Sequence, residues 1–175
     1  MLRVIVMRHA KSSWSDKSLD DPARPLSKRG VKAAPLMGSA LSERHLVPDH
    51  VACSPAKRTR ETLRLVLGAL EAKPSIEYAD ELYAFGDGTP YLNCIRRQAR
   101  STRTLMVVGH NPSVQNLCLN LCGGSRGPDF DALVRKFPTA GVAAMSFPID
   151  QWSEVEPGEG SLDLFLTPRM IVGDE

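Results

Sequence analysis

The sequence contains no internal repeat and no low-complexity tract, and its amino terminus lacks a long hydrophobic run. Only the short apolar run from Leu2 to Met7 precedes the charged and titratable pair Arg8 and His9. A membrane-spanning helix needs about 20 apolar residues, and a signal peptide places its apolar stretch behind a basic start. We therefore expect neither a signal peptide nor a membrane span at this end of the chain.

Cysteine is scarce, and its spacing does not suit a metal. The chain has 4 cysteines, none with the paired short spacings of a zinc site, so we expect buried free thiols: Cys53, Cys94, Cys118 and Cys122. Free thiols fit a reducing compartment, which predicts a cytoplasmic protein. The 4 histidines are not accompanied by a carboxylate-rich cluster. This disfavours a metal hydrolase, and we expect no metal and no other cofactor.

Positive and negative charges are nearly balanced. The 22 lysines and arginines against 20 acidic residues give a net charge of +2. This bias is too small to indicate a nucleic acid or a membrane surface as a partner. Any positive field should therefore be local, and no feature of the sequence indicates an oligomeric state.

The 175 residues are enough for one core of ordinary size, so we expect a single domain over residues 1–175. Short apolar runs that read as strands alternate with helical patterns. The expected strands lie at residues 2–7, 50–53, 75–78, 104–108, 142–147 and 162–166. This alternation predicts an α/β fold, a three-layer sandwich with a mostly parallel central sheet and helices on both faces.

Capping residues and prolines mark the expected helix starts. Ser27 is a plausible N-cap for a helix that carries apolar residues to Leu41, although Pro35 should kink this helix or delay its start. Ser54 and Pro55 fit the N-cap and first position of the next helix. Two more helices are expected to open at Thr89-Pro90 and Asn111-Pro112.

Basic and imidazole side chains follow the buried strands. Arg8 and His9 end the first strand, His110 follows the strand at 104–108, and Arg58 falls in the first turn of the second helix. Carboxyl ends of parallel strands meet at one sheet edge, and a helix N-terminus favours anions. These residues should therefore form a phosphate pocket. Arg60, two residues further along the helix, should lie on a different side, at the surface.

The order of these motifs resembles the histidine phosphatase superfamily, which includes the phosphoglycerate mutases. The residues that carry the resemblance are Arg8-His9-Ala10, Ser54-Pro55 with Arg58, Thr59, Glu61 and Thr62, and Gly109-His110-Asn111-Pro112. Further stretches are similar to the short SixA-type phosphohistidine phosphatases: Lys11-Ser12-Ser13-Trp14, Arg24-Pro25-Leu26-Ser27, Arg29-Gly30 and Thr167-Pro168-Arg169. The resemblance spans nearly the whole chain and implies a phosphoglycerate mutase-like fold.

The resemblance also implies roles for four residues. His9 would attack phosphorus and carry a phosphohistidine intermediate, and His110 would add a donor to the transition state. Arg8 and Arg58 would clamp the phosphoryl oxygens, since a guanidinium offers planar bidentate donors. Because an attacking ring nitrogen must be unprotonated, the other nitrogen of His9 should donate to a backbone carbonyl that fixes the tautomer.

Three further residues are weaker candidates. Superfamily members that act on phosphate esters use a carboxylic acid near the position of Glu81 to protonate the leaving oxygen, but a solvated carboxylate explains Glu81 equally well. Lys11 and Ser12 are candidates for substrate binding, although a solvated loop over the sheet edge explains them as well.

These observations predict a metal-independent phosphatase that acts on phosphohistidine in a protein or on a small phosphorylated compound. One alternative is a phosphatase of the same superfamily that acts on sugar or nucleotide phosphate esters. A mutase is disfavoured because the chain is short. An alternative of another class is a module that binds phosphorylated partners without turnover, although such a module would not need His9.

Overall fold

A six-stranded sheet forms the centre of the molecule, and the structure, a computed structural model, describes residues 1–173. Its strands are β1 (Leu2–Arg8), β2 (His50–Cys53), β3 (Ser75–Tyr78), β4 (Thr104–Gly109), β5 (Val142–Phe147) and β6 (Ser161–Leu166). They lie in the order β3-β2-β4-β1-β5-β6. The first four in this order pair in parallel, whereas β5 pairs antiparallel with both of its neighbours, β1 and β6. The predicted mostly parallel sheet is confirmed.

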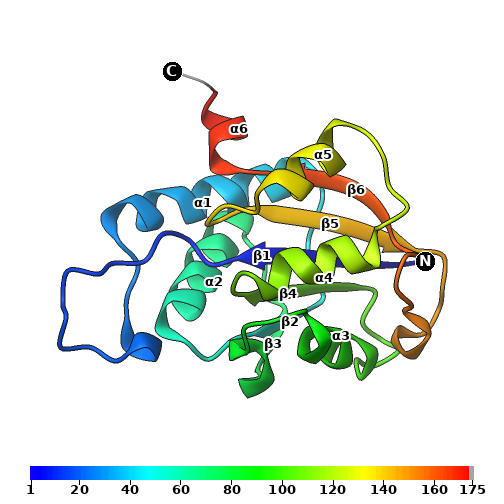
Figure 1. Ribbon diagram of the computed structural model, residues 1–175, viewed down its shortest axis with the longest axis horizontal. Coiled ribbons are helices and arrows are strands. Elements are labelled where there is room, and N and C mark those ends of the chain that lie inside the picture. Colours follow the sequence, from blue (N-terminus) through cyan, green and yellow to red (C-terminus); the bar gives the residue numbers. More distant parts are fainter. Residues whose placement is uncertain (174–175) are drawn as a thin grey trace.

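Helices cover both faces of this sheet (Figure 1). One face carries α1 (Lys28–Glu43), α2 (Lys57–Leu70) and α6 (Pro168–Val172), and the other carries α3 (Thr89–Arg96), α4 (Ser113–Leu121) and α5 (Pro128–Arg135). Short 3₁₀ helices lie at η1 (Asp21–Ala23), η2 (Asp80–Tyr83) and η3 (Trp152–Glu154). The three-layer α/β fold is as expected, although α5 was not predicted. None of the helices within residues 1–173 is both long and apolar enough to cross a membrane.

Strand β1 shows how the two core layers share one element. Val4 and Val6 pack into the layer under α3 and α4, while Ile5 and Met7 pack into the layer under α1 and α2. A strand buried on both faces must be apolar without alternation. The centre of the strand, from Val4 to Met7, is therefore apolar, and the charged side chains Arg3 and Arg8 lie towards its two ends, with His9 directly after it. The four cysteines are also buried and free, as predicted.

The helix starts agree only in part with the capping pattern. Ser27 caps α1 as predicted, because its Oγ accepts the amide of Gly30 at 3.2 Å, but Pro35 does not delay the start of the helix. For α2 the prediction was wrong by two residues, since the N-cap is Ala56. The side chain of Ser54 binds another partner, described below. Thr89 is likewise the first residue of α3 rather than its cap, which is Gly88.

One glycine sets the approach of β4 to α3. A Cβ at Gly109 would collide with the hydroxyl of Tyr91. That hydroxyl accepts the amide of His110 at 3.0 Å and donates to the carbonyl of Leu82 at 2.5 Å. Tyr91 therefore fixes the backbone where β4 delivers His110 to the sheet edge.

Candidate active site

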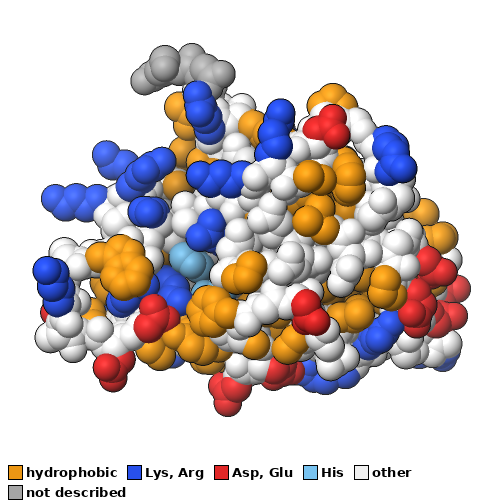
Figure 2. Space-filling view, viewed as in Figure 1, with side chains coloured by type: hydrophobic (Ala, Val, Ile, Leu, Met, Phe, Trp, Pro, Cys, Tyr) orange, Lys and Arg blue, Asp and Glu red, His pale blue; other side chains and the backbone are white. Residues whose placement is uncertain are grey.

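The four side chains predicted to share a phosphate pocket lie together at the carboxyl edge of the sheet. Arg8 and His9 leave β1, His110 leaves β4, and Arg58 reaches over from the first turn of α2. The rings of His9 and His110 lie 5.3 Å apart, and Nη2 of Arg58 lies 3.3 Å from Nδ1 of His110. Figure 2 shows a histidine at the surface among lysine and arginine side chains. The arrangement concentrates positive charge around two imidazoles.

The ring of His9 is held in one tautomer. Its Nδ1 lies 2.7 Å from the carbonyl oxygen of Ala10, so Nδ1 carries the proton and Nε2 is left with its lone pair, as the sequence predicted. Burial lowers the pKa of His9 to about 4, assisted by the charges of Arg58 and Arg8 and opposed by the Ala10 hydrogen bond. The imidazole is therefore neutral at pH 7, and Nε2 is available as a nucleophile.

Arg8 contributes a buried donor that is not satisfied. Its Nη1 donates to the carbonyl of Phe137 at 2.9 Å, whereas its buried Nε has no hydrogen-bond partner among residues 1–173. Burial lowers the pKa of Arg8, but a guanidinium keeps its charge throughout the accessible pH range. An unsatisfied buried N–H is costly to the fold.

Arg58 is held by an acidic residue that the sequence did not single out. It donates through Nη1 to the carbonyl of Asp21 at 2.9 Å and through Nη2 to the carboxylate of Asp21 at 3.0 Å. Tyr83 and Arg24 donate to the same carboxylate. Burial raises the pKa of Asp21, but the donors Tyr83, Arg24 and Arg58 together lower it to about 2. Asp21 is therefore a charged clamp on Arg58 at any ordinary pH.

The hydrogen bonds of His110 define its tautomer. Because Nη2 of Arg58 can only donate, Nδ1 of His110 accepts, and Nε2 donates to Oγ of Ser54 at 2.7 Å. Burial lowers the pKa of His110 to about 3, with further contributions from His9 and Arg58. His110 is therefore neutral, and both of its ring nitrogens are engaged. Ser54 serves this contact instead of capping α2.

The weaker candidates lie outside this cluster. Glu81 forms an ion pair with Arg97 at 2.9 Å and, within residues 1–173, makes no hydrogen bond to the two histidines or their arginines. Its turn, η2, instead contributes Tyr83. Oγ of Ser12 is buried and accepts from Nη2 of Arg24 at 2.5 Å. The side chain of Lys11 is exposed, whereas its carbonyl binds the amide of Ser27 at 2.8 Å.

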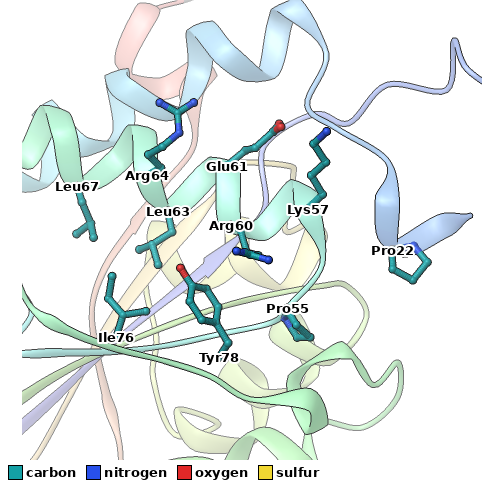
Figure 3. A pocket seen from close by; sticks show the side chains of 10 residues that line it. All are labelled: Pro22, Pro55, Lys57, Arg60, Glu61, Leu63, Arg64, Leu67, Ile76 and Tyr78. Carbon is teal, nitrogen blue, oxygen red and sulfur yellow. The ribbon is translucent and has the colours of Figure 1, made fainter. Parts of the chain in front are cut away.

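A separate cavity of about 740 Å³ lies between α2 and the edge strand β3 (Figure 3). Arg60 and Tyr78 face one another across it, with the guanidinium carbon 5.0 Å from the ring centre. Arg60 thus lies away from the imidazoles, on the side of α2 that the helical spacing predicted. None of Arg8, His9, Arg58 and His110 lines this cavity, so it is not the phosphate pocket that the sequence predicted.

Comparisons with known sequences agree with this geometry. Residues 4–86 match the model of the histidine phosphatase superfamily (branch 1). An uncharacterised protein of Mycobacterium tuberculosis is 36% identical over 165 residues, which span 93% of this chain and 100% of the relative. The phosphohistidine phosphatase SixA of Escherichia coli is 26% identical over 170 residues, 95% of this chain and 94% of the relative.

Comparison with solved structures also finds SixA proteins. A SixA structure from Agrobacterium tumefaciens has a TM-score of 0.80 and 29% identity, and the match covers 95% of this chain and 98% of the other. The protein histidine phosphatase SixA in complex with tungstate has a TM-score of 0.76 and 25% identity, with 97% and 99% covered. The expected phosphoglycerate mutase-like architecture is confirmed. The chain belongs to the histidine phosphatase superfamily and is a phosphatase similar to the SixA proteins.

Proposed function

We propose that this phosphatase hydrolyses phosphohistidine in a protein, or a small phosphorylated compound, without a metal and through a covalent phosphohistidine intermediate on His9. The observation that carries this proposal is the neutral ring of His9, whose Nδ1 is anchored on Ala10 and whose Nε2 is free to attack. The relatives named as phosphohistidine phosphatases support the substrate class.

The proposed reaction has two displacements at phosphorus. Nε2 of His9 forms a bond to phosphorus while the bond from phosphorus to the leaving nitrogen or oxygen breaks. Water then attacks the phosphohistidine, inorganic phosphate leaves, and Nε2 regains its lone pair. Because the transition state spreads charge over the equatorial oxygens, the guanidinium groups of Arg8 and Arg58 stabilise it electrostatically.

His110 takes its role only when a phosphoryl group is bound. In the free protein its Nδ1 accepts from Arg58, so it presents no free N–H. A phosphoryl group that draws Arg58 toward itself removes this donor and places negative charge near the ring, which favours protonation. A protonated His110 then donates to a phosphoryl oxygen while Nε2 stays on Ser54.

The geometry favours a phosphoramidate over a phosphate ester. Asp21 binds the cluster through Arg58, and its pKa of about 2 makes it a poor general acid at neutral pH. Glu81 is paired with Arg97 instead. A leaving imidazole can carry its own proton, so hydrolysis of phosphohistidine has less need of such an acid than hydrolysis of a sugar or nucleotide ester.

The test of this function is the release of inorganic phosphate from a phosphohistidine peptide and from a phosphate ester, both with a chelator present. We expect faster release from the peptide, with no loss of rate in the chelator. Loss of activity in chelator would overturn the metal-independent mechanism. Faster turnover of the ester would favour the ester phosphatase. Binding of both compounds without any phosphate release would favour the binding module.

Glu81→Gln is expected to change the rate on either substrate by less than about twofold, since the variant loses only a half-exposed ion pair with Arg97. A general acid would instead be worth a factor of about 10² to 10⁴ on an ester with a poor leaving group. Steady-state rates of Glu81→Gln on an ester and on a phosphoramidate distinguish the two. A loss of that size on the ester alone would identify Glu81 as the acid.

The acid limb of kcat/KM is expected near pH 4 rather than near the ordinary histidine value of 6.5. The reason is the lowered pKa of His9, about 4, which keeps Nε2 unprotonated as the pH falls through 6 and 5. The measurement is kcat/KM from pH 3.5 to 8, corrected for the ionisation of the substrate measured separately. A limb at pH 6.5 that the substrate does not explain would show that His9 is not the neutral, buried nucleophile.

A further inference from the structure

A second cavity, of about 310 Å³, carries a concentration of positive charge. It is lined by Lys11, Arg29, Ala33, Lys136, Pro138, Thr139, Thr167, Pro168 and Arg169. Lysine or arginine supplies 4 of these residues, and no acidic residue among residues 1–173 lines the cavity. Figure 2 shows lysine and arginine side chains gathered over this part of the surface, above the histidine. The charge balance of the whole chain, only +2, does not explain such a cluster.

This cavity borders the phosphate site through shared backbone. Lys136 and Pro138 flank Phe137, whose carbonyl accepts Nη1 of Arg8 at 2.9 Å. Lys11, two residues after His9, is one of the residues that line the cavity. The chain segments that follow His9 and that surround Phe137 thus contribute both to the contacts of Arg8 and His9 and to the lining of the cavity.

The positive charges around this cavity are electrostatically unfavourable in the absence of a ligand. Arg29 lies in the first turn of α1, and that turn contains no acidic residue. A positive charge at a helix N-terminus interacts unfavourably with the helix dipole. Arg29, Lys11 and Lys136 are exposed, and none of them forms an ion pair with an acidic residue within residues 1–173. Like charges around one concave site repel each other, and an anionic ligand would remove that repulsion.

We infer that this cavity binds a second anionic group of the substrate, a phosphate or a carboxylate placed a few bonds from the transferred phosphoryl group. The inference rests on the proposed function, which supplies the position of that phosphoryl group. It assigns a role to Arg29, Thr167 and Arg169, which the proposed phosphoryl transfer does not use. In a protein substrate the second group is an acidic side chain beside the phosphohistidine.

The test compares two phosphohistidine pentapeptides whose neighbouring residues are glutamate in one and glutamine in the other. The leaving imidazole is the same, so a difference in KM reports the second group. We expect a KM about tenfold lower for the glutamate peptide, as several exposed charge pairs together would give. In Arg29→Gln/Lys136→Gln the ratio of the two KM values should fall below about twofold. Higher salt should reduce the wild-type ratio as well.

The matched control is Lys32→Gln/Arg135→Gln, which removes the same charge from α1 and α5 at exposed residues that do not line the cavity. This variant should keep the wild-type ratio. Equal KM values for the two peptides in the wild type would overturn the inference. So would a wild-type ratio that persists in Arg29→Gln/Lys136→Gln, or one that is lost equally in the control.

Small ligands test the cavity independently of turnover. The probes are 4-phosphonobutyrate and butylphosphonate, which differ only in the carboxylate and whose dissociation constants are measured by calorimetry. Tighter binding of 4-phosphonobutyrate, lost in Arg29→Gln/Lys136→Gln but kept in the control, supports a site for small compounds that carry two anionic groups. Equal affinities together with a peptide effect assign the cavity to protein substrates. If neither peptide is hydrolysed, the proposed function fails. Equal affinities for the two phosphonates would in that case also overturn the inference that the cavity binds an anionic group.

Discussion

His9→Ala is expected to lose both turnover and covalent labelling, with kcat lower by about 10⁴-fold or more, as when other enzymes lose their nucleophile. The ring of His9 is the one whose Nδ1 is committed to a backbone carbonyl and whose Nε2 is unprotonated at neutral pH. We do not expect His110 to replace it, because Nε2 of His110 donates to Ser54, and Nδ1, once a phosphoryl group draws Arg58 away, takes up a proton under the proposed mechanism. The remaining guanidinium groups would still bind the phosphoryl group, but no nucleophile would be present to accept it.

The measurement is a rapid quench after mixing the protein with a labile phosphoryl donor. Wild-type protein should carry phosphate that is labile in acid and stable in alkali, and His9→Ala should carry none. His45→Asn is the control, because His45 is exposed, and asparagine tolerates its positive φ of 55°. Label that survives in His9→Ala would place the nucleophile elsewhere. Turnover without label in the wild type would indicate direct attack by water.

The parts of this site that the sequence predicted are those set by local pattern. A strand that is buried on both faces reads as a short apolar run, so the run before Arg8 located one strand end and the run before His110 located another. Helical spacing separated Arg58 from Arg60, and the two do lie on different sides of α2. Each of these inferences needed only neighbours along the chain and the rule that parallel strands share an edge.

The parts that were missed depend on contacts between distant segments. Asp21 looked like any polar residue of a loop, yet it lies 37 residues from its partner Arg58. Ser54 fitted a helix cap, but the imidazole 56 residues away takes its hydroxyl. The sequence around Glu81 suggested a carboxylic acid for the site, whereas the turn η2 presents Tyr83 to Asp21 instead. Local propensity does not encode which of several polar side chains a folded loop will present.

The short helix α5 was missed for a related reason. It has 8 residues, and Leu133 is the only one of them that is fully buried. So short an apolar pattern does not reveal a helix by periodicity, because the choice between helix and loop is made by tertiary packing. Its position matters nonetheless, since the chain that leaves α5 carries the carbonyl of Phe137 that orients Arg8.

Arg58→Gln is expected to lower kcat by about 10²- to 10³-fold, the usual effect of losing one preorganised donor to a transition-state anion. Arg58→Lys should fall nearly as far, because an ammonium cannot reproduce the planar fork that now holds Asp21 through two nitrogens. The thermal stability of both variants should change little. The side chain of Arg58 is only 4% exposed, but that of Asp21 is 43% exposed and keeps Arg24 and Tyr83 as donors, so removing Arg58 leaves no buried charge without a partner.

The measurement pairs steady-state kinetics with a thermal melt for each variant, and Arg60→Gln is the matched control on the same helix. Arg60 packs over Tyr78, away from the imidazoles, so its loss should leave kcat within about twofold. A large loss of kcat with an unchanged melting temperature separates transition-state stabilisation from scaffolding. A loss of activity in Arg58→Gln in proportion to a loss of stability would contradict this assignment. The hydrogen bonds from Arg58 to Asp21 would then serve to hold η1 against α2, and Arg8 alone would have to bind the phosphoryl group.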